Sequence, residues 1–156
     1  MDGHTNEDDG AFMYAALEEA AKGAAMGEVP IGAVLAHEGR IVARSHNHRE
    51  LWQDPTAHAE LIVIREAAKA LGRWRLVDST LFVTLEPCAM CLGAIILARV
   101  PRLVFGANDP KGGACGSVLN FASDPRLNHR VDVVGGIFAD ESQRMLAQFF
   151  KELRAQ

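Results

Sequence analysis

A strand, an apolar helical segment and a second strand follow one another between residues 79 and 108. The strands read STLFVTL (79–85) and RLVFGAN (102–108), and both are rich in β-branched and aromatic residues. The segment between them, CAMCLGAIILAR, is apolar on nearly every side, which predicts a buried helix. A strand, helix and strand in succession usually return in parallel through a right-handed crossover. The chain therefore requires a sheet that is at least partly parallel and is covered by helices.

The segments on either side extend this unit to an α/β fold with a mixed five-stranded sheet. Helix formers at helical spacing, β-branched runs and glycine stops define these segments. The closing helix has Asp140 as a candidate N-cap, with Leu146 and Phe149 on its inner face. The predicted elements are a helix over 12–26, a hairpin from Val29 to Asn47, a helix over 58–71, a last strand in VDVVGGI and a closing helix over 139–156.

The length of 156 residues fits one domain. The first ten residues, MDGHTNEDDG, are polar and acidic and lack the parts of a secretory signal. We expect a disordered acidic N-terminus over residues 1–10 and a single domain over residues 11–156. No apolar run approaches the ~20 residues that span a bilayer, so we expect a cytoplasmic protein that does not enter a membrane.

The net charge of −4 comes from the N-terminus. Four of the 20 acidic residues lie among the first ten residues, which leaves 16 acids against 16 bases in the remainder. This neutral body argues against a broad basic surface for non-specific nucleic-acid binding and leaves room only for a local basic patch.

Two short motifs carry candidate metal chemistry. HAE begins at His58, and PCAMC holds Cys88 and Cys91, which are two of only three cysteines. Cysteines three residues apart share one helix face at ~5–6 Å and can bind one zinc ion, and a neutral His58 adds a third ligand. Three protein ligands leave a fourth position for water, as in catalytic zinc sites. Glu60 would then line the cleft as the base that assists the water.

Other interpretations of these residues exist. A lone Cys-x-x-Cys is often a redox pair or half of a structural zinc site, and a lone His-x-Glu is usually a solvated helix start. A structural zinc ion would need a fourth ligand, for which Cys115 and, more weakly, His129 are available. Cys115 lies in a glycine-rich loop and fits a small packed side chain better than a ligand.

Together, H-x-E and P-C-x-x-C form the signature of zinc nucleobase deaminases. The chain is most similar to bacterial tRNA-specific adenosine deaminases, of the cytidine and deoxycytidylate deaminase superfamily. VPIGAVL, DPTAHAE, TLEPCAMC, FGANDPKGGACGS and NHRV match that family in order, and the resemblance covers about residues 12 to 153.

The resemblance implies a homodimer with the three-layer α/β/α fold of cytidine deaminases and a central mixed five-stranded sheet. It implies hydrolytic conversion of adenosine to inosine at the wobble position of a tRNA anticodon stem-loop. His58, Cys88 and Cys91 would hold one zinc ion per subunit, and Glu60 would move protons from the attacking water to N1 and the departing amine.

The same resemblance indicates residues that bind the substrate. They include an amide for a base edge, loop charges for ribose and phosphate, an apolar wall for the flipped base and an aromatic residue for the anticodon loop. Each also fits a plainer role in a turn, in a solvated loop or in the core. These residues are Asn47, Asp109, Lys111, Pro30, Ile31 and Phe149.

Two other functions remain open at this point. A zinc deaminase of a free base or nucleotide, such as guanine, cytosine or deoxycytidylate, shares both motifs, although FGANDPKGGACGS and NHRV favour RNA. A non-catalytic RNA-binding or structural zinc module would keep the fold without the reaction. The presence of Glu60 argues against that module, because an inactive relative often loses this residue.

Overall fold

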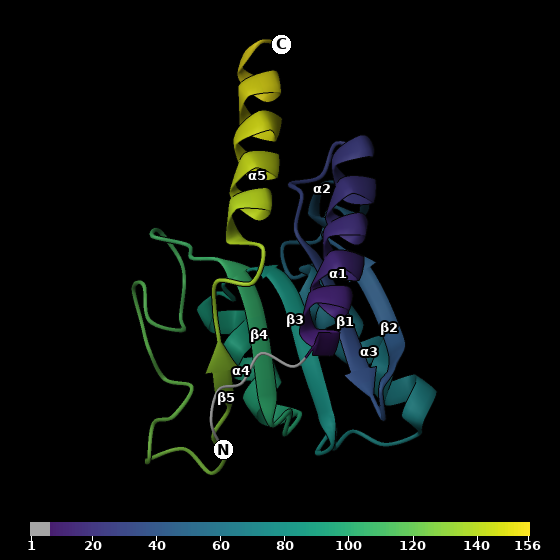
Figure 1. Cartoon of the computed structure of the whole chain (residues 1–156), viewed down its shortest axis with the longest axis vertical. Coiled ribbons are helices and arrows are strands. Elements are labelled where there is room, and N and C mark those ends of the chain that lie inside the picture. Colours follow the sequence, from purple (N-terminus) through teal and green to yellow (C-terminus); the bar gives the residue numbers. More distant parts are fainter. Residues whose placement is uncertain (1–6) are drawn as a thin grey trace.

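The computed structural model describes residues 7–156, which form a mixed sheet between two layers of helices (Figure 1). The strand order is β2, β1, β3, β4, β5; β1 is antiparallel to both of its neighbours, and β3, β4 and β5 are parallel. Along the chain the elements are α1 (Glu7–Ala25), β1 (Gly32–His37), β2 (Arg40–His46), α2 (Arg49–Trp52), α3 (Ala59–Leu71), β3 (Ser79–Leu85), α4 (Ala89–Leu97), β4 (Arg102–Ala107), β5 (Asp132–Val134) and α5 (Ala139–Arg154).

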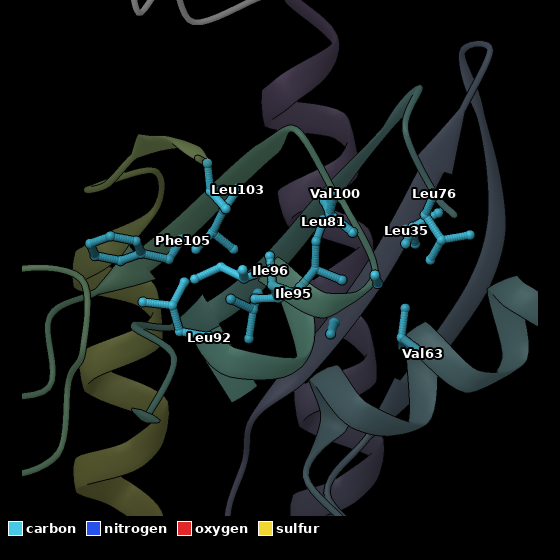
Figure 2. Packing of buried hydrophobic residues seen from close by; sticks show 14 of the residues in the cluster. Leu35, Val63, Leu76, Leu81, Leu92, Ile95, Ile96, Val100, Leu103 and Phe105 are labelled. Carbon is cyan, nitrogen blue, oxygen red and sulfur yellow. The ribbon is translucent and has the colours of Figure 1, made fainter. Parts of the chain in front are cut away.

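Alternate side chains of each strand enter two separate apolar clusters. Val34 and Phe82 pack against α1 on one face of the sheet. Leu35 and Leu81 point to the other face and join the cluster that contains residues of α3 and α4 (Figure 2). Because α5 contacts α1, β3 and β4, it shares the layer of α1. These layers confirm the predicted three-layer α/β/α fold and its five-stranded sheet.

The strand directions place several chain segments at one edge of the sheet. Since β1 is antiparallel to β2 and β3, strands β2, β3, β4 and β5 all run the same way. Their carboxyl ends therefore meet at one edge, and Figure 1 shows α2 and α5 beyond this end of the sheet. The segments that leave it are 47–58, 86–88, 108–117 and 135–138. In open α/β sheets this edge is where ligands bind.

The first helix begins at Glu7 rather than at residue 12. The segment predicted to be disordered covers residues 1–10; residues 1–6 lie outside the described residues, and residues 7–10 form the start of α1. Asp9 is 2% exposed and holds the guanidinium of Arg102 through contacts of 2.9 Å and 2.6 Å. Acidic side chains also stabilise the positive end of a helix, so this part of the acidic segment belongs to the fold.

Two details differ from the predictions. A four-residue helix, α2, lies in the polar stretch before residue 55, where no element was predicted. The N-cap of α5 is Phe138, with φ of 56°, and not Asp140, because the amide of Ser142 donates to the Phe138 carbonyl at 3.1 Å. Asp140 lies within the first turn, where its carboxylate still faces the positive helix end.

Helix α4 is buried on one side only, although its sequence predicted burial all round. Cys91, Leu92 and Ile95 are fully buried, whereas Leu97 is 70% exposed. The exposed side borders an apolar groove that includes Leu127. The apolar character of the segment therefore reflects both the core and an uncovered surface.

Within residues 7–156, no helix has the length and apolarity needed to cross a membrane.

Candidate active site

His58 and Cys88 are the N-cap residues of α3 and α4. Both have extended backbones, with φ of −78° and −75°, and neither side chain makes a capping hydrogen bond at the start of its own helix. The two helices pack against each other, and both begin at the edge where the carboxyl ends of the strands meet. The imidazole and the thiol are therefore free to face one another.

The three predicted metal ligands lie together. Sγ of Cys88 and Sγ of Cys91 are 3.7 Å and 3.4 Å from Nδ1 of His58, and all three atoms lie within 4.8 Å of one another. Around a tetrahedral zinc ion, nitrogen at about 2.0 Å and sulfur at about 2.3 Å stand roughly 3.5 Å apart. The spacing and the soft donor set therefore both fit zinc.

Hydrogen bonding within this group distributes the protons unequally. Hydrogen bonding with Cys91 lowers the pKa of Cys88 to about 3, against the effect of burial, and His58 adds to the lowering. The hydrogen bond with Cys88, together with burial, raises the pKa of Cys91. The hydrogen bond with Cys88 also raises the pKa of His58. Cys88 is thus the thiolate of the group, and a thiolate is the form of cysteine that binds a metal ion.

A fourth protein ligand does not join this group among residues 7–156. Cys115 lies in the loop after β4 and stands outside the group, and burial raises the pKa of its thiol to about 12. His129 bonds through Nε2 to the carbonyl of Val100 at 2.8 Å. Three ligands with an open fourth position are typical of catalytic zinc and not of structural zinc.

Glu60 lies in the first turn of α3, two residues after His58, and is 4% exposed. Burial raises its pKa to about 7, and the charges of His58 and Cys88 also act on it, in opposite directions. The carboxyl group therefore shares the surroundings of the three ligands without being one of them. A carboxyl group with a pKa near neutrality is suited to accept and return protons.

Glu86 is a buried carboxylate that the sequence did not single out. It is 2% exposed and accepts backbone N–H bonds from Asp109 (3.0 Å), Cys115 (2.9 Å) and Ser117 (3.1 Å), as well as the Ser117 hydroxyl. Burial acts to raise its pKa, but the hydrogen bonds from Ser117 and the backbone hold the pKa below its usual value. Glu86 therefore fixes the 109–117 loop beside Cys88.

The close approach of the loop to Glu86 requires a glycine at position 113. A Cβ at Gly113 would stand 2.3 Å from the carboxyl carbon of Glu86, which is far inside any real contact. In the sequence, Glu86 is marked only by its position between an apolar strand and Pro87. A sequence pattern does not reveal its partners, because they lie 23 to 31 residues further along the chain.

Replacing Glu86 by alanine should release the 109–117 loop. The loss leaves four donors without their acceptor, each at a cost of about 1–3 kcal/mol where water cannot replace it. We expect faster hydrogen exchange at the amides of Cys115 and Ser117 and a lower melting temperature. Glu38→Ala is the matched control, because Glu38 is an exposed glutamate in the β1–β2 turn. Unchanged exchange at the two loop amides would contradict the role of Glu86.

Among the predicted substrate-binding residues, Asn47 has the clearest position. It is 2% exposed, and its Oδ1 accepts the backbone N–H of Ala59 at 2.9 Å, directly beside His58. Pro30 is buried, and the half-buried Ile31 packs against the main apolar cluster. The amide of Asn47 therefore has a fixed orientation at the start of α3.

The loop and helix candidates are more exposed. Oδ1 of Asp109 accepts the backbone N–H of Lys111 at 3.0 Å, so this half-buried carboxylate shapes its own loop, whereas Lys111 is exposed. On α5, Phe149 is half-buried and meets the exposed ring of Phe150 edge to face, with centroids 5.5 Å apart. Asp109 and Lys111 follow β4 at the same edge of the sheet as His58.

Comparison with known proteins agrees with this geometry. The model of the MafB19-like deaminase family matches residues 7–154. The tRNA-specific adenosine deaminase of Bacillus subtilis is 54% identical over 94% of this chain and 91% of its own length, and that of Agrobacterium fabrum is 52% identical over 92% and 94%.

Two solved structures are also similar. One, from a study of A-to-I editing by tRNA:A34 deaminases at the wobble position of transfer RNA, is 51% identical, with a TM-score of 0.84 over 87% of this chain and 99% of that chain. The guanine deaminase of Bacillus subtilis is 40% identical, with a TM-score of 0.61 over 67% of this chain and 66% of that chain.

The three-layer fold and the family match define the chain as a deaminase, and its His58, Cys88 and Cys91 group could hold a zinc ion. Within this class, the relatives that match at 45–54% identity over nearly the whole chain share one name. The chain belongs to the family of tRNA-specific adenosine deaminases.

Proposed function

We propose that this protein converts adenosine to inosine by hydrolysis at the wobble position of a tRNA anticodon. The observation that carries the proposal is the buried Glu60 beside the group of His58, Cys88 and Cys91, in a chain that matches tRNA-specific adenosine deaminases over almost its full length. Adenosine and water would give inosine and ammonia, with no further reactant.

His58, Cys88 and Cys91 would hold one zinc ion per subunit. Zinc in such a site supplies Lewis-acid activation of a water molecule at neutral pH. Glu60 would accept a proton from this water as its oxygen attacks C6 of adenine. Glu60 would then deliver protons to N1 and to the departing amine, so that one carboxyl group acts as both base and acid.

Substrate binding would involve the segments that leave the same edge of the sheet. Within residues 7–156, no group accepts from the amide nitrogen of Asn47, which is therefore available to a base edge. Asp109 would accept from a ribose hydroxyl, and Lys111 would meet a phosphate. Pro30 and Ile31 would form the apolar wall for the flipped base, and Phe149 would meet the anticodon loop.

A second function is deamination of a free base or nucleotide. The similarity to a guanine deaminase, at 40% identity and a TM-score of 0.61, supports this alternative. The structure from the tRNA:A34 deaminase study is more similar, however, at 51% identity and a TM-score of 0.84. The balance favours an RNA substrate.

The test is product formation from competing substrates by the zinc-loaded protein. A tRNA anticodon stem-loop with adenosine at the wobble position would be compared with free adenosine, guanine and cytidine, scoring inosine and ammonia. We expect inosine in the stem-loop alone. The same RNA with its only adenosine in the base-paired stem is the control. Product from a free base or nucleoside but not from the stem-loop would contradict the RNA assignment.

We also infer that two copies of the chain associate and that they act in the cytoplasm, where the proposed tRNA substrate is found. The exposed Leu97 of α4 and the neighbouring Leu127 form an apolar surface of the kind that oligomers bury. A solution mass of twice the 16.9 kDa of one chain is expected by light scattering. A mass of one chain at micromolar concentration would rule out a stable dimer.

A further inference from the structure

Three aromatic rings form a continuous stack between β2 and α2. The rings of His46 and His48 have centroids 4.3 Å apart and planes 15° apart, and His48 and Trp52 have centroids 4.3 Å apart and planes 25° apart. His46 is 5% exposed and Trp52 is 51% exposed. The stack therefore begins in the core and ends at the surface, with a large indole at its outer end.

Hydrogen bonds hold the two histidines in place. Nδ1 of His46 pairs with the carbonyl of Asn47 at 2.9 Å, and Nδ1 of His48 pairs with the carbonyl of His46 at 2.8 Å. The backbone N–H of His48 donates to the carbonyl of Ala57 at 3.0 Å. The base of the stack is thus tied to the segment that leads into α3.

A buried carboxylate holds the helix that carries Trp52. Glu28 is 1% exposed and accepts the backbone N–H groups of Glu50 and Leu51 at 3.1 Å and 2.6 Å. These contacts fix the first turn of α2 from a distant part of the chain. An aromatic side chain whose support is rigid before binding loses little conformational entropy when a ligand stacks on it.

The stack lies next to the candidate active site. Asn47 stands between its two histidines in the chain, and Oδ1 of Asn47 bonds to the amide of Ala59 beside His58. The stack also follows the carboxyl end of β2, at the edge from which Cys88 and the 109–117 loop emerge after β3 and β4. A ligand that reaches the metal ligands as part of a longer strand passes close to this place.

The chemistry of the surface fits a nucleobase. Bases of single-stranded RNA stack on aromatic faces largely irrespective of their identity. Arg49, an exposed cation on α2, can meet a phosphate of the same strand. A stack that served only to fill the core would not need an indole that is half exposed.

We propose that the His46–His48–Trp52 stack is a platform on which the base of a nucleotide flanking the deaminated adenosine rests. The proposal rests on the RNA substrate proposed above and adds a second base-binding position to it. Its effect is on RNA binding, because the platform lies outside the group that performs the reaction. A free nucleoside lacks the flanking base and cannot use it.

Substitution of Trp52 provides the main test. Removing a stacking aromatic weakens RNA binding by about 5- to 100-fold. We expect Trp52→Ala to raise the Kd and KM for the anticodon stem-loop by this factor, with zinc content and kcat close to wild type, and Trp52→Phe to recover most of the loss. The matched control is Trp74→Ala: Trp74 is 58% exposed and precedes β3, at the opposite edge of the sheet. Equal Kd values for Trp52→Ala and the wild type would overturn the proposal.

Substrates with an abasic flanking nucleotide separate stacking from a structural role. If the platform holds one base, the penalty of Trp52→Ala disappears on the stem-loop that lacks that base and persists on the others. An equal penalty on every abasic stem-loop would show that Trp52 only supports the fold and would overturn the proposal. Inosine formation by the wild type is scored in parallel. Its absence would reject the RNA substrate itself, whereas normal inosine formation with no effect of Trp52 would reject only the platform.

Discussion

Glu60→Gln should reduce deamination of the anticodon stem-loop by a factor of about 10² to 10⁴ while leaving the zinc content unchanged. Glutamine has nearly the shape of glutamate and fits the same buried position in the first turn of α3. It cannot accept a proton from water or return one to N1 and the amine. Single-turnover rates of inosine formation, with zinc measured by mass spectrometry in the same samples, provide the measurement.

A second glutamate of the same helix supplies the control. Glu66 is exposed on α3, and its carboxylate approaches Lys69 at 3.9 Å, on the surface. Glu66→Gln changes the charge of the helix by the same amount and should keep the wild-type rate. If Glu60→Gln turned over at the wild-type rate, the proton transfers would have to be assigned to another residue.

The parts of the fold with local signals were predicted well. The strand predicted over residues 79–85 is β3 (Ser79–Leu85), and the helix predicted over 58–71 is α3 (Ala59–Leu71). In both, the signal belongs to the element itself: α3 has one apolar face at helical spacing, and β3 is a short apolar run that is buried on both faces of the sheet. By contrast, α2 has four residues and is held by Glu28, more than 20 positions earlier. The local sequence pattern around α2 does not indicate these hydrogen bonds to Glu28.

In the candidate site, too, the contacts within one element could be predicted from the sequence, and those between distant segments could not. Cys88 and Cys91 are three residues apart on one helix, so their shared face follows from helix geometry. The meeting of His58 with these cysteines depends on the packing of α3 against α4; donor chemistry offered His58 as a third ligand, and the resemblance to a family supported that choice. The contacts of Glu86 with the loop and of Asn47 with Ala59 join distant segments. Such contacts require the fold before they can be inferred.

Removing one of the proposed zinc ligands should abolish activity and lower stability together. We expect Cys88→Ala to bind much less than one zinc ion per chain and to show no measurable inosine formation, because the remaining two ligands cannot complete a tetrahedral site. A metal ion present at about 1,000 times its Kd stabilises a fold by ~4 kcal/mol, which corresponds to roughly 10 °C in melting temperature for a domain of this size. Chelation of the wild type should produce a similar fall, and added zinc should reverse it.

Substitution of Cys115 is the control for this experiment. It is the remaining cysteine of the chain and is partly buried, but its sulfur stands outside the three-ligand group. Cys115→Ala should therefore keep one zinc ion per chain, so that any loss in Cys88→Ala reflects metal binding and not the loss of a thiol as such. If instead Cys88→Ala kept its zinc and Cys115→Ala lost it, the metal would have to bind in the 109–117 loop. The open fourth position that the proposed reaction requires would then have no support.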